Sequence, residues 1–197
     1  VTAANVFAPI TDVHSVIQGI CSLIGQDGVF VSENHYLGNV MNDLQYDTVY
    51  HEHLRYYSVT SLKNLFMSHG LKIFKVVRIP SHGGSIRVYA SRNSNRHSDG
   101  SFEKFLAEEN KMHLVNSKGD QEFKDKILAS KFKLLSLMAN LRLDGKSIVG
   151  IGAPSRASTL LKFTGLDHTF LDAIMEISSS KKIGKFMPGT KIPVLDE

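Results

Sequence analysis

Hydrophobic positions in the first ninety residues follow helical spacing in some stretches and strand spacing in others. Apolar residues recur every three or four positions in Val13–Ile24, after a Thr11-Asp12 cap, and again in Ser58–His69, which predicts two helices. Short β-rich runs predict strands at residues 1–9, 29–31, 73–79 and 86–90. The order strand, helix, strand, helix, strand, strand favours a mostly parallel sheet closed by an antiparallel pair.

The second half begins with a polar stretch, residues 93–100, that contains no large apolar residue and marks a boundary. Helical spacing then predicts packing helices around 102–106 and 123–141. A strand at 147–149, a helix at 155–163 and a strand at 173–177 form a new βαβ unit. The predicted fold class is therefore α/β, in three regions: residues 1–92, 93–145 and 146–197.

Composition narrows the class of protein. The 197 residues are 42% hydrophobic, which is typical of a globular protein with a core. A net charge of +4 comes from scattered basic residues, so it supports an anionic small molecule more than nucleic acid. The single cysteine, Cys21, excludes an internal disulfide and a cysteine-only zinc site. No membrane helix or signal peptide is evident, and we expect a cytoplasmic protein with no membrane partner. We expect both ends of the sequence to be cut points within a longer chain.

Proton-handling side chains concentrate in Tyr50-His51-Glu52-His53, just beyond a predicted strand. Histidine titrates near neutral pH and serves as a general base, while a neighbouring Glu or Tyr fixes its tautomer or holds a substrate oxygen. The alternative is that these are surface or structural residues. The sequence does not continue as HExxH, so no metal site is predicted.

Two glycine-marked turns follow. Gly83-Gly84, after His82, allows close backbone approach to a ligand. Arg87 in the next strand has the shape to bind a phosphate. A plain hairpin turn explains the two glycines equally well. Gly150-Ile151-Gly152 resembles the start of a dinucleotide turn, with Ser155 where a third glycine is expected. Glu176, after the next strand, is placed to hold a ribose.

Short motifs also follow one another along the whole chain. They are Asn5-Val6-Phe7-Ala8, Tyr46-Asp47-Thr48-Val49-Tyr50-His51-Glu52-His53, Tyr56-Tyr57-Ser58, His69-Gly70-Leu71, His82-Gly83-Gly84-Ser85-Ile86-Arg87, Gly150-Ile151-Gly152-Ala153-Pro154, Thr159-Leu160-Leu161 and Pro188-Gly189-Thr190. This series closely resembles the sugar C-methyltransferases, which use S-adenosylmethionine to methylate C3 of nucleotide-linked 4-keto deoxysugars. One departure is Pro9, where relatives usually carry His.

The resemblance implies a particular domain organisation. Family members have an N-terminal zinc-binding region, a class I methyltransferase domain and a C-terminal Rossmann-like domain, with the sugar between the last two. Residues 1–92 then correspond to the second half of the methyltransferase sheet, and residues 146–197 to the start of the C-terminal domain. Zinc is expected only in the missing N-terminal region, and most of the S-adenosylmethionine pocket lies outside this chain.

The resemblance also implies roles for individual residues. His53 is the expected base, with Glu52 and Tyr50 orienting it or binding the sugar. The expected contacts to the sugar or diphosphate come from His51, His82, Gly83, Gly84, Ser85 and Arg87. The expected contacts to the nucleotide come from Gly150, Gly152 and Ser155. Asn5 and Phe7 are the expected remnants of the cofactor site.

The predicted function is methyl transfer from S-adenosylmethionine to a carbon of a nucleotide-linked keto-deoxysugar through a histidine-assisted enolate. The isolated fragment is expected to be inactive. Two alternatives remain: a sugar-nucleotide-binding module and an NAD(P)-dependent sugar oxidoreductase that reads its cofactor through residues 150–155. The absent third glycine and the Tyr50–His53 segment argue against the oxidoreductase.

Overall fold

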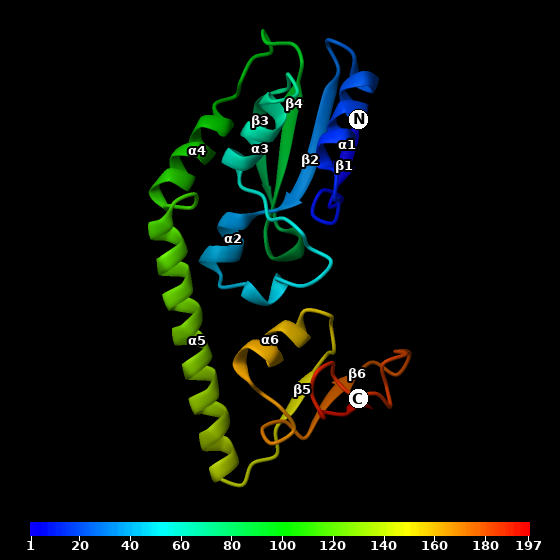
Figure 1. The fold of residues 1–197 in the computed structure, drawn as a ribbon, viewed down its shortest axis with the longest axis vertical. Coiled ribbons are helices and arrows are strands. Elements are labelled where there is room, and N and C mark those ends of the chain that lie inside the picture. The colour runs from blue at the N-terminus through cyan, green and yellow to red at the C-terminus, as the bar shows by residue number, and fades with distance from the viewer. The chain divides into compact units, whose positions relative to one another are not determined.

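The computed structural model describes residues 1–197, and the chain divides into two compact units (Figure 1). The N-terminal unit comprises Val1–Gln45 and His51–Phe123, and the C-terminal unit comprises Tyr46–Tyr50 and Lys124–Glu197. The chain therefore enters the C-terminal unit at Tyr46, returns to the N-terminal unit at His51 and crosses again inside a long helix.

The N-terminal unit is built on a sheet with the strand order β1-β2-β4-β3. Its strands are β1 (Thr2–Ala4), β2 (Val29–His35), β3 (Lys72–Ile79) and β4 (Ser85–Ser91). β1 and β2 are parallel, whereas β4 is antiparallel to both of its neighbours, β2 and β3. The predicted antiparallel pair is thus confirmed, and β4 lies between β2 and β3.

Four helices of this unit contribute to one hydrophobic core with the sheet. They are α1 (Val13–Ile24), α2 (Leu37–Asn42), α3 (Val59–Met67) and α4 (Ser101–Lys111). The side chain of Asp12 accepts a hydrogen bond from Ser15 N and so caps α1 as the sequence predicts. In the core, the buried rings of Phe30 and Phe66 meet edge to face at a centroid distance of 5.4 Å, and Phe7 packs against both.

A buried carboxylate joins α4 to α3. Glu109 is only 1% exposed, although acidic side chains are rarely buried unless they have partners. Its oxygens accept hydrogen bonds from Val59 N at 2.6 Å, from Thr60 N at 2.9 Å and from Thr60 Oγ1 at 2.6 Å. These donors lie in the first turn of α3, where a negative charge is also favoured by the helix dipole. Glu109 therefore caps a helix that is distant in sequence.

The C-terminal unit contains a three-stranded parallel sheet in the order β5-β6-β7. Its elements are most of α5 (Ser117–Leu143), then β5 (Val149–Ile151), α6 (Ala157–Thr164), β6 (Ala173–Glu176) and β7 (Val194–Asp196). The β5-α6-β6 sequence confirms the predicted βαβ unit. Its core is aliphatic, and Met138 of α5 packs with Leu161 of α6 and Ile174 of β6.

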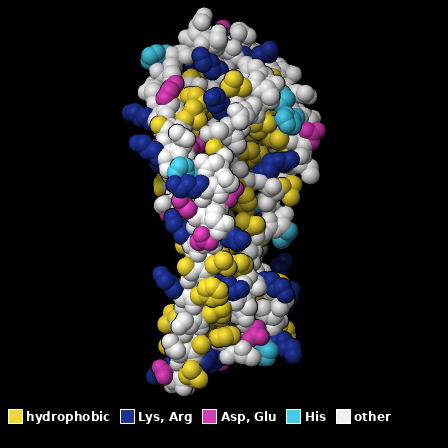
Figure 2. Space-filling model, turned by 60° about the vertical axis from the view of Figure 1, so that its left-hand side comes forward, with side chains coloured by type: hydrophobic (Ala, Val, Ile, Leu, Met, Phe, Trp, Pro, Cys, Tyr) yellow, Lys and Arg dark blue, Asp and Glu magenta, His cyan; other side chains and the backbone are white.

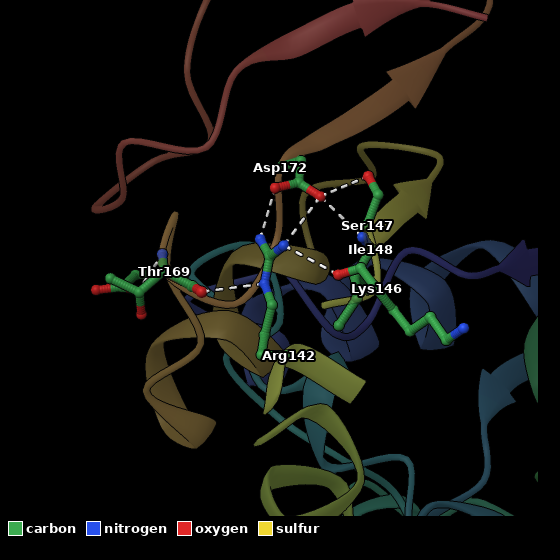
Figure 3. Close-up of polar contacts among 7 residues, drawn as sticks. Arg142, Lys146, Ser147, Ile148, Thr169 and Asp172 are labelled. Carbon is green, nitrogen blue, oxygen red and sulfur yellow. Dashed lines mark hydrogen bonds and ion pairs between the residues drawn. The ribbon is translucent and has the colours of Figure 1, made fainter. Parts of the chain in front are cut away.

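An ion pair fastens the end of α5 to this sheet (Figure 3). Arg142 contacts Asp172 through Nη2 at 2.6 Å and Nη1 at 3.2 Å. The same carboxylate accepts hydrogen bonds from Ser147 Oγ at 2.7 Å and Ile148 N at 2.8 Å. The guanidinium also donates to the carbonyl oxygens of Thr169 and Lys146. These donors hold the pKa of the Asp172 carboxyl well below its usual range, with Arg142 as the largest cause.

Two elements depart from the predictions. β2 continues to His35 rather than becoming polar loop at Ser32, because Ser32 and Asn34 are buried and hydrogen-bond each other at 2.6 Å. The short helix α2 follows β2 and was not predicted, since its six residues are too few to display a helical period.

Charged side chains are dispersed over the surface. Figure 2 shows Lys and Arg on the face in view, spread among Asp and Glu rather than gathered into one block. None of the helices combines the length and the apolar character needed to cross a membrane.

Candidate active site

The candidate site of the N-terminal unit lies at one edge of its sheet. β1 and β2 end at this edge, and antiparallel β4 begins there, because His35 pairs with Ser85. Asn5 N, just after β1, donates to Glu33 O of β2 at 2.8 Å, and Tyr36 N donates to Gly84 O at 3.1 Å, so the segment after β2 meets the Gly-Gly turn. Ligands of open α/β sheets bind at the carboxyl ends of parallel strands.

The loop that carries His53 is fastened close to this edge. Leu54 N donates to Ala8 O at 3.0 Å, and the guanidinium of Arg55 donates to Ile10 O and Thr11 O. Further along the chain, Tyr57 O accepts a hydrogen bond from Leu37 N at 2.9 Å. The loop is therefore held against the segment that follows β1. That segment contains Asn5 and Phe7, the residues predicted to face the cofactor.

His53 is the one histidine of the Tyr50–His53 motif that is partly buried. Burial lowers the pKa of its imidazole below the usual value, Glu52 opposes this shift, and His82 adds to it. Nδ1 is shielded from solvent, and the ring meets that of Tyr56 at a centroid distance of 5.9 Å. A neutral imidazole at neutral pH is what a general base requires.

The neighbours of His53 in the motif are more exposed. The side chains of His51 and Glu52 are 83% and 59% exposed, and His51 Nε2 lies 3.9 Å from Glu52 Oε1. A contact so open to solvent contributes little to stability. Glu52 acts on His53 through its charge.

The Gly83-Gly84 turn is shaped by the residues of α2 and its tail. His82 has φ 54°, and Gly83 and Gly84 have φ 80° and 117°. A Cβ added at Gly84 would lie 2.4 Å from Asn39 Cγ, and one at Gly83 would lie 2.8 Å from Gln45 Oε1. Gln45 Nε2 also donates to Gly83 O at 2.7 Å. Both positions have a positive φ that favours glycine, and at Gly84 the close approach of Asn39 adds a packing reason. A left-handed histidine beside them is an uncommon conformation.

Arg87 and Ser85 project from the start of β4 into a polar network. Arg87 donates to one carboxylate oxygen of Glu33 from Nε at 3.0 Å and from Nη2 at 2.8 Å. Ser81 Oγ reaches the other oxygen at 3.3 Å, and the buried Ser85 Oγ donates to Ser81 O at 3.1 Å. Arg87 therefore has a carboxylate partner at this edge, and its contact with a phosphate stays a prediction.

The two predicted cofactor residues differ in how far their side chains are exposed to solvent. Asn5 is exposed and adopts φ 55°, directly after β1. Phe7 is only 1% exposed and belongs to the aromatic core, so its side chain has a packing role. Only the backbone of Phe7 is available to contact a cofactor.

The remaining predicted residues belong to the C-terminal unit. Tyr50 ends the segment Tyr46–Tyr50, and it is partly buried. Gly150 and Gly152 line an apolar pocket of about 390 Å³, whose rim includes Arg156. Ser155 lines a smaller pocket of about 200 Å³. The structure therefore distributes the three predicted nucleotide contacts over two neighbouring hollows of one loop.

The smaller pocket has a basic rim that sequence reasoning missed. Lys182 and Lys185 line it, and Lys182 Nζ donates to Ala153 O at 2.6 Å. Glu176, which is predicted to hold a ribose, accepts hydrogen bonds from Ala153 N at 2.9 Å and Ile177 N at 3.1 Å, and its contact with a ribose stays a prediction. These two backbone donors lower the pKa of its carboxyl. One carboxylate oxygen thus holds the glycine loop at Ala153, and the other accepts from the residue that follows β6.

Together, the fold and the site define a mixed α/β protein in which a partly buried histidine lies near the edge of a sheet. Residues 80–197 match the family model for the C-methyltransferase C-terminal domain. C-methyltransferase NovU of Streptomyces niveus is 35% identical over 189 residues, which cover 95% of this chain. The chain belongs to the C-methyltransferase family. It spans 45% of the length of NovU.

Proposed function

We propose that this chain supplies the substrate-handling part of an S-adenosylmethionine-dependent C-methyltransferase that acts on a nucleotide-linked keto-deoxysugar. The family supports transfer of a methyl group to carbon. The observation that carries the proposal is His53, whose pKa is lowered by burial so that it is a neutral base at neutral pH.

His53 removes a proton from the carbon beside the ketone. The C–H bond breaks, its electron pair becomes the carbon–carbon double bond of the enolate, and the carbonyl π electrons move to oxygen. The proton goes to Nε2, since Nδ1 is buried. The carboxylate of Glu52 stabilises the imidazolium that forms, as its effect on the pKa of His53 indicates. Tyr50 binds the sugar carbonyl or hydroxyl.

The residues of this chain do not by themselves fit S-adenosylmethionine. Phe7 is in the core, and the exposed Asn5 alone does not make a cofactor pocket. When bound, the cofactor supplies the methyl group as a sulfonium. For this chain we therefore derive only the proton-transfer step, and His82, Ser85 and Arg87 hold the sugar or diphosphate during it.

The sheet supports placing the N-terminal unit as the second half of a class I methyltransferase domain. Its antiparallel β4 lies between β2 and β3 at one side of a sheet whose other strands run parallel. The C-terminal unit, with its parallel β5-β6-β7 sheet and glycine loop, is the start of a Rossmann-like domain that holds the nucleotide. Engagement of Glu176 by two backbone amides disfavours an NAD(P)-dependent oxidoreductase, which needs such a carboxylate for the ribose.

The proton-transfer step can be tested on this chain without the methyl donor. We expect it to exchange the proton beside the ketone of a thymidine or uridine diphosphate-linked 4-keto-6-deoxyhexose for deuterium in D₂O, followed by NMR. His53→Asn should lower the exchange rate by a factor of about 10²–10⁴, the usual contribution of a general base. Nucleotide-sugar affinity, measured by calorimetry, should change little.

His97→Asn is the matched control, because His97 is an exposed histidine of the same unit outside the candidate site. Its exchange rate should equal that of the unaltered chain. Equal rates in the unaltered chain and His53→Asn would remove His53 as the base. Binding without any exchange above buffer would instead support a sugar-nucleotide-binding module, the second candidate for this chain, which the burial of Phe7 favours.

A further inference from the structure

A histidine and a tyrosine lie side by side at the sheet edge that carries the candidate site. Tyr36 forms an isolated parallel bridge with Tyr57, and Leu37 N donates to Tyr57 O at 2.9 Å. His35 and Tyr56 precede the bridged residues, so the same register makes them neighbours. Side chains of extended chain alternate between its two faces, and Tyr36 and Tyr57 are buried. His35 and Tyr56 therefore share the opposite face, where both are half-buried.

The ring of Tyr56 contacts two imidazoles. Its centroid lies 6.5 Å from that of His35 and 5.9 Å from that of His53, at interplanar angles of 62° and 65°. These are edge-to-face contacts at the usual separation of aromatic pairs. The backbone around Tyr56 is held on both sides by the hydrogen bonds of Leu54 N and Tyr57 O. The Tyr56 ring thus joins His35 to the candidate base.

His35 is itself fixed by Gln45, in the loop after α2. Gln45 Nε2 donates to Gly83 O at 2.7 Å, and a carbonyl oxygen can only accept, so this atom is assigned as the amide nitrogen. The other atom, Oε1, lies 3.1 Å from His35 Nε2. Because Oε1 can only accept, Nε2 of His35 carries a proton.

A chain of contacts therefore runs from the Gly83-Gly84 turn through Gln45, His35 and Tyr56 to His53. Every member of it belongs to the N-terminal unit.

From these contacts we infer that Tyr56 and His35 are positioning residues for the base. The inference rests on the proposed function. Tyr56 limits the rotation of the His53 imidazole, and His35, fixed by Gln45, limits the movement of Tyr56. Neither residue exchanges a proton with the substrate. A displacement of about 1 Å at a reacting group can cost about 10²-fold in rate.

Tyr56 acts on His53 by packing rather than by charge. The charged and titratable groups that shift the pKa of His53 are Glu52, which raises it, and His82, which lowers it, and burial is a larger cause than either. An aromatic ring in contact with the imidazole excludes water from it. Loss of the Tyr56 ring should therefore weaken the effect of burial.

The first test is an NMR titration, which does not depend on activity. Tyr56→Leu should raise the pKa of His53 toward its usual value, whereas Tyr56→Phe, which keeps the ring, should leave it unchanged. His35→Asn should raise the pKa by a smaller amount, and it should add nothing in the Tyr56→Leu background, because His35 acts through the Tyr56 ring.

An identical His53 titration in the unaltered chain and in Tyr56→Leu overturns the proposal, as does an equal shift in Tyr56→Leu and Tyr56→Phe. An undiminished effect of His35→Asn in the Tyr56→Leu background removes His35 from it. If Tyr56→Leu does not fold, the titration of His35→Asn decides the proposal in its place, and an unchanged His53 pKa overturns it.

Two residues of the same unit serve as matched controls. His69 is also half-buried, and its Nε2 lies 2.8 Å from His14 Nδ1. Phe74 is a half-buried ring of β3 that packs against Tyr89. Both lie toward the end of the sheet where Lys72 pairs with the last residue of β4, away from the candidate site. His69→Asn and Phe74→Leu should leave the His53 titration unchanged.

The tautomer of His35 can be measured directly. At about pH 8, well above the usual histidine pKa of about 6.5, a long-range ¹⁵N–¹H correlation spectrum should show the His35 proton on Nε2. A spectrum with the proton on Nδ1 alone overturns the link through Gln45.

The last test uses the deuterium-exchange assay. Tyr56→Leu should lower the exchange rate about 10-fold to 100-fold with nucleotide-sugar affinity little changed, whereas Tyr56→Phe and His69→Asn should stay within about 3-fold. If His53→Asn is inactive and Tyr56→Leu is fully active, the positioning role fails while the proposed function stands. If His53→Asn is fully active, the proposed function fails, and the titrations alone decide whether Tyr56 and His35 hold the imidazole.

Discussion

Removal of the Glu109 carboxylate should destabilise the N-terminal unit far more than its place on the surface helix α4 suggests. The substitution Glu109→Gln keeps the shape of the side chain but removes the charge that accepts hydrogen bonds from Val59 N and Thr60 N. Hydrogen bonds to a charged group contribute about 1.5–3 kcal/mol each. The amide oxygen of Gln still accepts one of these bonds, now as a neutral bond, while the amide NH₂ faces the other donor. The cost is therefore about 2–4 kcal/mol, a large part of the roughly 5–15 kcal/mol that holds a domain together.

The neighbouring residue offers a matched control. Glu108 lies on the same helix and is half exposed, and its carboxylate pairs with Arg78 at 2.5 Å. Glu108→Gln makes the same chemical change but should cost less than about 1 kcal/mol, as exposed ion pairs do.

Urea unfolding followed by circular dichroism measures the free energy of both variants. Because two units need not unfold together, amide exchange at Val59 and Thr60 should be followed as well, since it reports opening of α3 alone. The reasoning is refuted if Glu109→Gln is no less stable than Glu108→Gln, or if exchange in α3 is not accelerated.

Two further predictions concern pH. NMR titration of His53 should give a pKa below its usual value of about 6.5; Glu52→Gln should lower it further and His82→Asn should raise it, because Glu52 raises the pKa and His82 lowers it. A shift in the opposite direction in either variant would contradict this account of the site. The carboxyl of Asp172 has a folded-state pKa below its unfolded value, so its contribution to stability is present above pH of about 4 and is lost as pH falls through the folded pKa. Asp172→Asn should therefore lower the unfolding free energy at pH 6 and reduce its dependence on pH below about 4, and unfolding curves with an unchanged acid dependence would disprove this.

Hydrophobic spacing predicted the elements that have one face in the core and one in water. Val13–Ile24 and the β5-α6-β6 unit are examples, because their apolar positions repeat at the period of the element. β2 was predicted too short, since Ser32 and Asn34 face inward and satisfy each other there. Spacing alone cannot distinguish such an inward polar residue from the start of a loop.

The candidate site was found by composition, but its surroundings were not. The density of titratable groups singled out His53, yet burial sets its pKa, and burial depends on chain segments far away in sequence. Glu33 is 54 residues from its partner Arg87, and Asp47 is 109 residues from Arg156. No local pattern reveals such pairs. The packing of Asn39 and Gln45 against the Gly83-Gly84 turn could not be predicted for the same reason.

The double crossing of the chain at Tyr46 and His51 has a consequence for recombination between family members. No single breakpoint separates the two units, since Tyr46–Tyr50 belongs with residues 124–197. A graft that exchanges only the later segment brings a new α6 but keeps the recipient's Asp47 and Val49. Chimaeras that exchange the C-terminal unit should therefore transfer residues 46–50 together with the later segment, as one block in two pieces.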